Sequence, residues 1–272
     1  MSSAPASERH EPEVVRDDEL LRVWFLPGDS DRLVVSFCGI GLDGEEVQSP
    51  EFLGSARGEA GNQVLFIADK ARSWLNAPGI VEEIAATIRR WTERSGAAQV
   101  SMLGNSMGGF MAMVMPAHVP TVASIGFSPQ FSIDPEIARE TRRWQRWRER
   151  ISEIRIRQAS DYLVPRTAYY VIHGDHGRER TQSLPYVGLT GVRHFVMPRT
   201  IHNTAWKLRR RKALAEVVAF AVANRPRRLK QALGRVGVHE SRRDRAAEET
   251  EKVEPESRQV APVRHVTQGG AR

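Results

Sequence analysis

The sequence predicts a three-layer α/β fold with a mainly parallel central sheet. Strand-like and helix-like segments alternate along most of the chain, which is typical of helices packed on both faces of a sheet. Several of the strand-like segments are apolar on both faces, as expected for strands buried between two helical layers. The chain has 272 residues, of which 40% are hydrophobic, and this is enough for the core of one large domain.

The strands are predicted from short runs of β-branched and aromatic residues. They are expected at Arg22 to Leu26, Leu33 to Phe37, Val64 to Ala68, Val100 to Leu103, Val122 to Phe127, Ala168 to Ile172 and Val192 to Met197. Helices are expected at Pro78 to Arg94, Met107 to Val114 and Thr204 to Ala223. Proline in the first turn and Gly96 after the last turn mark the ends of the first of these helices.

Both ends of the chain are predicted to be disordered. Met1 to Glu19 is rich in Ser, Pro, Glu and Asp, with almost no apolar periodicity. Residues 225–272 carry 12 Lys and Arg residues against 7 Asp and Glu residues, so this tail holds +5 of the formal charge of +7. We expect a solvated tail with no specific nucleic-acid partner, and a folded domain over residues 20–224.

One segment interrupts the alternation of strands and helices. Residues 134–158 follow the strand that ends at Phe127, and they read as a long helix carrying Trp144 and Trp147 among several arginines. An open α/β sheet can accept an insertion at this edge, so the segment is predicted to be a helical lid. The tryptophans are expected to face inward and the arginines outward. The alternative is that these side chains stack on bases or clamp an acidic substrate.

The composition favours a reducing compartment and no membrane span. Cys38 is the single cysteine, so no disulfide can form within the chain. Met1 to Glu19 lacks the apolar stretch of a secretory signal. The apolar run at residues 214–223 is about half the length of a membrane span. We therefore expect a cytoplasmic protein.

The sequence Gly104-Asn105-Ser106-Met107-Gly108-Gly109 predicts a serine nucleophile on a sharp turn between a strand and a helix. Such a turn strains the serine backbone, and glycines are needed where a side chain would collide with the neighbouring chain. The pattern is short enough to arise by chance, but a buried strand precedes it and an apolar helix follows it. Ser106 is therefore the first candidate for a catalytic residue.

Two further strand ends supply residues that could activate Ser106. Ligands of open α/β sheets bind outside the carboxyl ends of the strands, so residues that follow different strands meet there. Asp175 follows the strand at residues 168–172, and His202 follows the strand at residues 192–197. His202 is predicted to be the base that takes the serine proton, and Asp175 the acid that orients His202.

Acyl transfer also needs donors for an oxyanion. One backbone N–H comes from the residue after the nucleophile, which is Met107. The other is expected from Ile40, between Gly39 and Gly41 in the loop after an early strand. The same loop could equally be an ordinary tight turn.

These motifs resemble the serine α/β-hydrolase superfamily over about residues 20–223. The resemblance lies in Ser106 within G-N-S-M-G-G, Asp175 within H-G-D and His202 before Asn203, in the order serine, acid, histidine. Blocks at residues 128–133 and around 74–79 are similar to a poorly characterised bacterial branch found in surface-polysaccharide and glycosyltransferase contexts. The resemblance implies an α/β-hydrolase fold, a serine triad and no cofactor.

The position of the acid departs from the superfamily pattern. Many members carry the aspartate two residues later, and Gly177 occupies that position here. Glu179 lies two residues further on and is the alternative acid.

The function predicted from the sequence is hydrolysis of a small-molecule ester or thioester through an acyl-enzyme on Ser106. Two alternatives remain at this point. One is a binding protein on a hydrolase fold that recognises a glycan or acyl group without turnover. The other is metal-assisted hydrolysis at a cluster of His173, Asp175 and His176.

Overall fold

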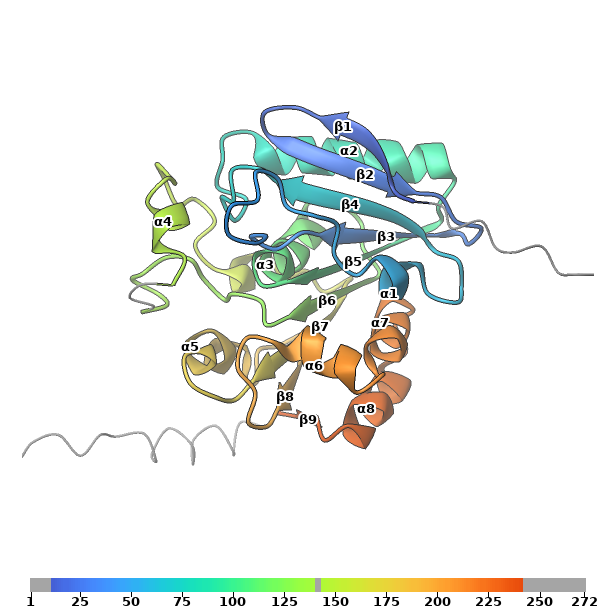
Figure 1. Cartoon of the computed structure of the whole chain (residues 1–272). Helices are drawn as coiled ribbons and strands as arrows, with labels where there is room; N and C mark the ends of the chain where they lie inside the picture. Colours follow the sequence, from blue (N-terminus) through green and yellow to red (C-terminus); the bar gives the residue numbers. More distant parts are fainter. Residues whose placement is uncertain (1–10, 140–142, 242–272) are drawn as a thin grey trace, which may run out of the picture.

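In the part of the chain that the computed structural model describes, residues 11–139 and 143–241, nine strands form one sheet (Figure 1). The strands are β1 (Glu13–Asp17), β2 (Leu21–Leu26), β3 (Arg32–Phe37), β4 (Gln63–Asp69), β5 (Gln99–Asn105), β6 (Ala123–Phe127), β7 (Ala168–Gly174), β8 (Val192–Met197) and β9 (His239–Glu240). Their order across the sheet is β1-β2-β4-β3-β5-β6-β7-β8-β9. In this order, all neighbouring strands from β4 to β8 are parallel. The pairs β1–β2, β2–β4 and β8–β9 are antiparallel. The predicted α/β fold with a mainly parallel sheet is confirmed.

Helices cover both faces of the sheet (Figure 1). On one face lie α2 (Ile80–Ser95) and α3 (Met107–Val114), and on the other lie α1 (Leu53–Arg57), α6 (Thr204–Arg210), α7 (Leu214–Val222) and α8 (Pro226–Arg235). The short helices α4 (Gln145–Arg148) and α5 (Glu179–Ser183) lie at the edge where the parallel strands end. Single 3₁₀ turns occur at Met115–Ala117, Ala159–Tyr162 and Leu184–Tyr186.

The two layers of helices enclose two separate apolar cores. Successive side chains of a strand point to opposite faces, so Val35 of β3 joins one core and Val34 joins the other. Helix α2 contributes Ile84 and Ile88 to the first core, and α7 contributes Val217 to the second. Burial of both strand faces explains why the central strands are apolar throughout.

The predicted disorder of residues 1–19 is wrong for the segment that forms β1. Val14 of β1 pairs opposite Trp24 of β2, which makes β1 the edge strand of the sheet. Its signal in the sequence is only two valines between charged residues, because an edge strand faces solvent along much of its length. Residues 1–10 lie outside the described residues.

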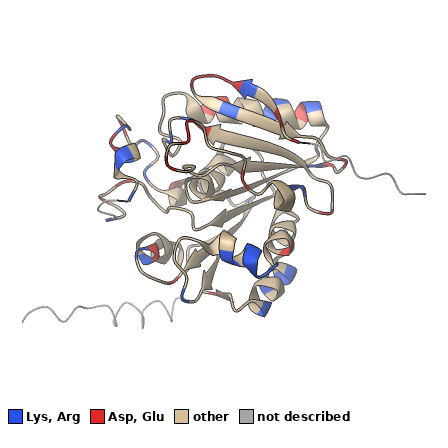
Figure 2. Ribbon diagram, viewed as in Figure 1, with Lys and Arg blue, Asp and Glu red and all other residues tan. Residues whose placement is uncertain are grey.

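The predicted tail at residues 225–272 also begins too early. Helix α8 buries Leu229, Ala232 and Leu233 against the second core, and β9 pairs with β8. Lys and Arg residues are frequent along α8, so part of the basic charge assigned to the tail belongs to the folded domain (Figure 2). Residues 242–272 lie outside the described residues.

Two of the predicted helices have other bounds in the structure. The segment 204–223 is divided into α6 and α7, because Lys212 between them has a left-handed backbone with φ of 55°. The prediction of a long helix over residues 134–158 is wrong. The described part of that segment contains only the short helix α4, and residues 140–142 lie outside the described residues. Within the described ranges, no helix combines the length and the apolarity that crossing a bilayer requires.

Candidate active site

Ser106 lies on a strained turn between β5 and α3. Its backbone has φ of 56° and ψ of −120°, a conformation that non-glycine residues rarely adopt. A Cβ atom at Gly104 would lie 2.2 Å from the backbone of Gly108, and one at Gly108 would lie 2.2 Å from the carbonyl oxygen of Phe37. Glycine is therefore required at both positions, as the sequence predicts, and the turn presents the serine at the end of the sheet.

The structure brings Ser106 and His202 together. The hydroxyl Oγ of Ser106 lies 2.8 Å from Nε2 of His202, which sits in the loop between β8 and α6. The other ring nitrogen, Nδ1, lies 2.8 Å from Oε1 of Glu179, the first residue of α5. A serine, a histidine and a carboxylate thus form one continuous chain of hydrogen bonds.

The predicted pairing of Asp175 with His202 is wrong in this structure. Asp175 is directed back to the loop after β8, where its Oδ1 accepts a long hydrogen bond of 3.4 Å from the backbone N–H of Thr200. The chain then turns at Gly177, which has φ of 63°, before α5 begins at Glu179. That turn carries the Glu179 carboxylate back toward His202. The alternative acid is therefore the one that the structure places beside the histidine.

Glu179 is held in the charged state by its neighbours. Its side chain is only 2% exposed, and burial alone would disfavour the charge. The hydrogen bond to His202 and the charge of that ring are the largest opposing effects. Together with a smaller effect of Arg143, whose Nη1 lies 2.8 Å from Oε1, they outweigh burial and lower the pKa of Glu179 to about 2. The carboxylate can therefore stabilise a positive charge on His202.

A third side chain reaches Ser106, and the sequence analysis did not identify it. Gln130, which is fully buried, donates a hydrogen bond of 2.9 Å from Nε2 to Oγ of Ser106. It follows β6, and β6 pairs with β5 in parallel, so residues just beyond the two strands become neighbours. The signal available in the sequence was a buried strand followed by Ser128-Pro129-Gln130, but nothing in the sequence places this glutamine beside Ser106.

The loop that holds Ile40 is fixed from two sides. Nε of Arg72 donates to the carbonyl oxygen of Ile40 at 2.8 Å, and the backbone N–H of Gly39 donates to Oε1 of Glu51 at 3.1 Å. The start of this loop lies against the first turn of α3, since Gly108 fits directly onto Phe37 and Cys38. Met107 is the first residue of α3, and the N–H groups of a first helical turn have no acceptor within the helix. The two predicted oxyanion donors therefore come from adjacent segments.

Glu51 gives this loop a dependence on pH. Burial raises the pKa of Glu51 to about 7, from an ordinary value of 4.5. Between these values the native state binds more protons than the unfolded state, so the free energy of unfolding falls as pH rises through this window. Glu51→Gln keeps an acceptor for Gly39 and removes the charge.

At about pH 8 we expect the free energy of unfolding of Glu51→Gln to exceed that of the parent protein by about 1 to 3 kcal/mol. At about pH 3, below both pKa values, Glu51 is neutral in the native and in the unfolded state, and the difference should vanish. Urea titrations at the two pH values would measure this. A difference that is the same at both pH values would contradict the assigned role of ionisation.

The cluster of His173, Asp175 and His176 is not assembled as a metal site. His173 is fully buried, with Nε2 at 2.8 Å from the carbonyl oxygen of Pro129 and Nδ1 at 3.1 Å from Nε2 of His194. Burial lowers the pKa of His173 to about 4, so the ring is neutral and both nitrogens are engaged. Among the described residues, no group of three or more His, Cys, Asp or Glu side chains could hold a metal ion.

The tautomers of this histidine pair follow from their partners. A carbonyl oxygen only accepts, so Nε2 of His173 carries the proton and Nδ1 accepts from Nε2 of His194. Nδ1 of His194 then accepts from the hydroxyl of Ser241 at 3.0 Å. These histidines therefore hold the loop after β6 in place through the hydrogen bond to the carbonyl oxygen of Pro129.

Aromatic and basic side chains line the approach to the site. The Trp144 ring lies 5.7 Å from the His202 ring, and the Arg143 guanidinium lies 4.4 Å from the Trp144 ring. A cavity of about 460 Å³ is lined by Ile40, Asp43, Trp144, Gln145, Arg146, Trp147 and Glu149. The segment at residues 143–149 therefore borders the site, although it is not the long helix that was predicted.

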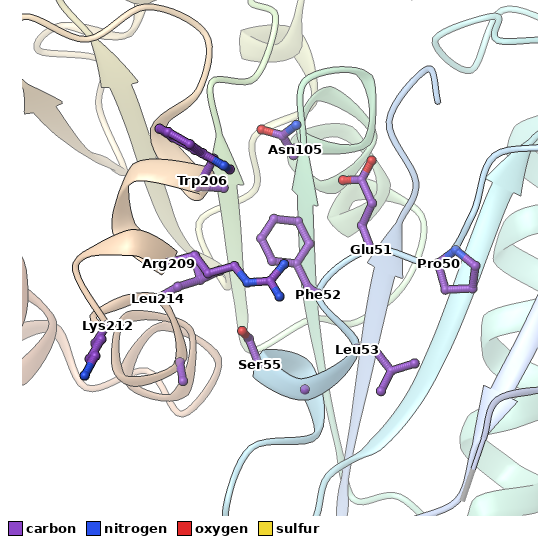
Figure 3. A pocket seen from close by; sticks show the side chains of 13 residues that line it. Pro50, Glu51, Phe52, Leu53, Ser55, Asn105, Trp206, Arg209, Lys212 and Leu214 are labelled. Atoms are coloured by element: carbon purple, nitrogen blue, oxygen red, sulfur yellow. The ribbon is translucent and has the colours of Figure 1, made fainter. Parts of the chain in front are cut away.

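A second cavity, of about 660 Å³, begins at Asn105, the residue before the nucleophile (Figure 3). It lies between the segment at residues 50–55 and the helices α6 and α7. Figure 3 shows the Arg209 side chain extending toward the ring of Phe52, with Trp206 near Asn105. This cavity therefore borders the turn of Ser106 at Asn105, and Ser106, Ile40 and His202 are not among its lining residues.

In sequence, the chain matches no protein-family model and no curated protein. In structure, it is similar to 2,6-dihydroxy-pseudo-oxynicotine hydrolase, with 15% identity and a TM-score of 0.54, covering 79% of this chain and 68% of that one. It is similar to XC6422 from Xanthomonas campestris, described as an α/β serine hydrolase without lid, with 14% identity and a TM-score of 0.51, covering 82% and 97%. The capsule O-acetyltransferase of Neisseria meningitidis serogroup A has 12% identity and a TM-score of 0.52, with 75% and 92% covered. These similarities show that the chain has an α/β-hydrolase fold.

Proposed function

We propose that this protein is a serine hydrolase that cleaves a small-molecule ester or thioester through an acyl-enzyme on Ser106. The observation that carries the proposal is a pair of hydrogen bonds, each 2.8 Å long, that link Ser106 to His202 and His202 to the buried Glu179 carboxylate. A free serine hydroxyl is a poor nucleophile near neutral pH, and this arrangement is the one that activates it. The strained turn at Ser106 adds support, because backbone strain is concentrated at functional sites.

The first half of the reaction follows from the contacts. Oγ of Ser106 forms a bond to the substrate carbonyl carbon while its proton passes to Nε2 of His202. The carbonyl electron pair moves onto oxygen, and the N–H groups of Met107 and Ile40 are proposed to bind that oxyanion. Glu179 accepts the Nδ1–H of His202 and stabilises the imidazolium.

The second half releases the acyl group. The oxyanion collapses and expels the alcohol or thiol, and His202 gives its proton to this leaving group. The acyl-enzyme on Ser106 remains. Water then loses a proton to His202 as it attacks the ester carbon, and the serine recovers its proton when the acid departs. Every proton movement is between the substrate, water, Ser106 and His202, so no cofactor enters the proposed cycle.

The test is reaction of the native protein with a fluorophosphonate probe, followed by mass spectrometry of the labelled peptide. The proposal expects one adduct, on Ser106, and hydrolysis of some members of a panel of p-nitrophenyl esters and acyl thioesters of varied chain length. Absence of labelling would contradict the proposal and favour the non-catalytic alternative. That alternative expects a glycan or acyl ligand to raise the melting temperature without being consumed.

A further inference from the structure

The side chain of Gln130 occupies an unusual place for an amide, because it touches the proposed nucleophile directly. Its Nε2 lies 2.9 Å from Oγ of Ser106, and the residue has no exposed surface. Its Oε1 lies 3.0 Å from Nε1 of Trp74, which is also fully buried. Both ends of the amide are therefore engaged, one with Trp74 and the other with Ser106.

Trp74 determines which way the amide faces. The indole Nε1–H can only donate a hydrogen bond, so it requires the amide oxygen of Gln130 on its side. The NH₂ group then has to face Ser106. As a result, Oγ accepts a hydrogen bond from Gln130, and its own proton is directed to Nε2 of His202.

The backbone that carries Gln130 is held tightly at the end of β6. Ser128 has a left-handed backbone, with φ of 43°, and its N–H donates to the carbonyl oxygen of Ile172 at 2.7 Å. The carbonyl oxygen of Gln130 accepts a hydrogen bond of 3.0 Å from the hydroxyl of Tyr186. A fully buried amide on such a segment is preorganised, which is the condition under which a hydrogen-bond donor contributes most to catalysis.

We propose that Gln130 is a catalytic residue, whose amide orients the Ser106 hydroxyl in the resting state and donates to the oxyanion in the tetrahedral intermediate. This inference rests on the proposed hydrolase function. When Oγ bonds to the carbonyl carbon, it gives up its proton to His202, and the carbonyl electron pair moves onto oxygen. Oγ then accepts hydrogen bonds more weakly, while the new oxyanion is bonded to the same carbon and lies close to the same N–H donor.

The inference identifies a side-chain donor in addition to the backbone N–H groups of Met107 and Ile40. Side-chain amides are known to act as oxyanion donors, and removal of one such donor lowers kcat by about 10²- to 10³-fold. Gln130→Met has a similar length and no donor. We therefore expect the rate constant for fluorophosphonate labelling and the kcat for p-nitrophenyl acetate to fall by about 10²- to 10³-fold in this variant.

Gln130→Glu tests the donor itself, because only the protonated carboxyl group can donate to Ser106. Burial raises the pKa of a carboxyl group, so protonation should begin well above its ordinary value. We expect the ratio of the variant's rate constant to that of the parent protein to rise as pH falls. A role in packing alone would leave this ratio independent of pH.

Gln63→Met is the matched control. Gln63 is another buried glutamine at the amino end of β4, and its Nε2 donates to the carbonyl oxygens of Ser30 and Ser95 but not to Ser106. Its variant should keep the rate constant of the parent protein, and thermal melting of each variant would report on the fold. Trp74→Phe should also slow labelling, because the amide can then turn its oxygen toward Ser106.

The outcomes separate the inference from the function on which it rests. If the parent protein is labelled at Ser106 and Gln130→Met reacts at the same rate, the inference is overturned and the hydrolase function stands. If the parent protein is not labelled at all, the hydrolase function fails and the inference fails with it. A pH-independent ratio for Gln130→Glu would also overturn the inference, even if Gln130→Met failed to fold.

Discussion

Replacement of His202 with alanine is expected to lower kcat for ester hydrolysis by about 10⁶-fold, as far as removal of Ser106 itself. The reason is the direction of the hydrogen bonds at Oγ of Ser106. Gln130 only donates to this oxygen, so His202 is the neighbour that can receive the serine proton. Loss of either member of the pair removes the activated nucleophile, and the two effects should not add.

The measurement compares kcat of His202→Ala, Ser106→Ala and the double variant on a p-nitrophenyl ester that the parent protein hydrolyses. His176→Ala is the control, because His176 is exposed and lies in the neighbouring loop. A kcat of His202→Ala similar to that of the parent protein would mean that another group takes the proton, and the proposed mechanism would then be wrong.

Replacement of Glu179 with glutamine is expected to lower kcat by about 10⁴-fold. The carboxylate accepts from Nδ1 of His202 at 2.8 Å, which leaves Nε2 free to receive the serine proton. A glutamine can present an N–H group to Nδ1 instead, which favours the wrong tautomer, and it cannot balance the charge of the imidazolium. Asp175→Asn is the control, and it should keep nearly full activity because Asp175 binds the Thr200 backbone.

The pH dependence of kcat adds a second measurement for Glu179. Because the pKa of Glu179 is lowered to about 2, its carboxylate stays charged as pH falls from neutrality to well below the ordinary value of 4.5. Any loss of activity at moderately acidic pH should therefore come from groups other than Glu179. If Asp175→Asn, rather than Glu179→Gln, abolished activity, the assignment of the acid would have to be reversed.

The arrangement of Ser106 and His202 could be predicted because each follows a recognisable strand. Parallel strands end at the same edge of a sheet, so residues far apart in the sequence are expected to meet there. The choice between Asp175 and Glu179 could not be made in this way. It depends on the turn at Gly177 and on where α5 begins, because these set the direction of the Glu179 carboxylate, and neither is marked by a hydrophobic pattern in the sequence.

Other features escaped prediction for different physical reasons. Gln130 becomes visible only when β6 is known to be the neighbour of β5, and strand order is a property of the whole sheet. Helix α8 did leave a signal, since Leu229, Ala232 and Leu233 recur at helical spacing. The surrounding arginines outweighed that signal, although a helix on the surface is expected to be charged on its outer face.

The hydrogen bonds of the buried histidine pair place the end of this domain further along the chain than its composition suggests. Ser241 donates to His194, His194 donates to His173, and His173 donates to the carbonyl oxygen of Pro129, the residue before Gln130. The last described residue of the chain is thus joined to the nucleophile through a relay of four hydrogen bonds, the last from Gln130 to Ser106. Residues 225–241 of the basic segment are therefore part of the support of the site, and the folded domain extends at least to Ser241.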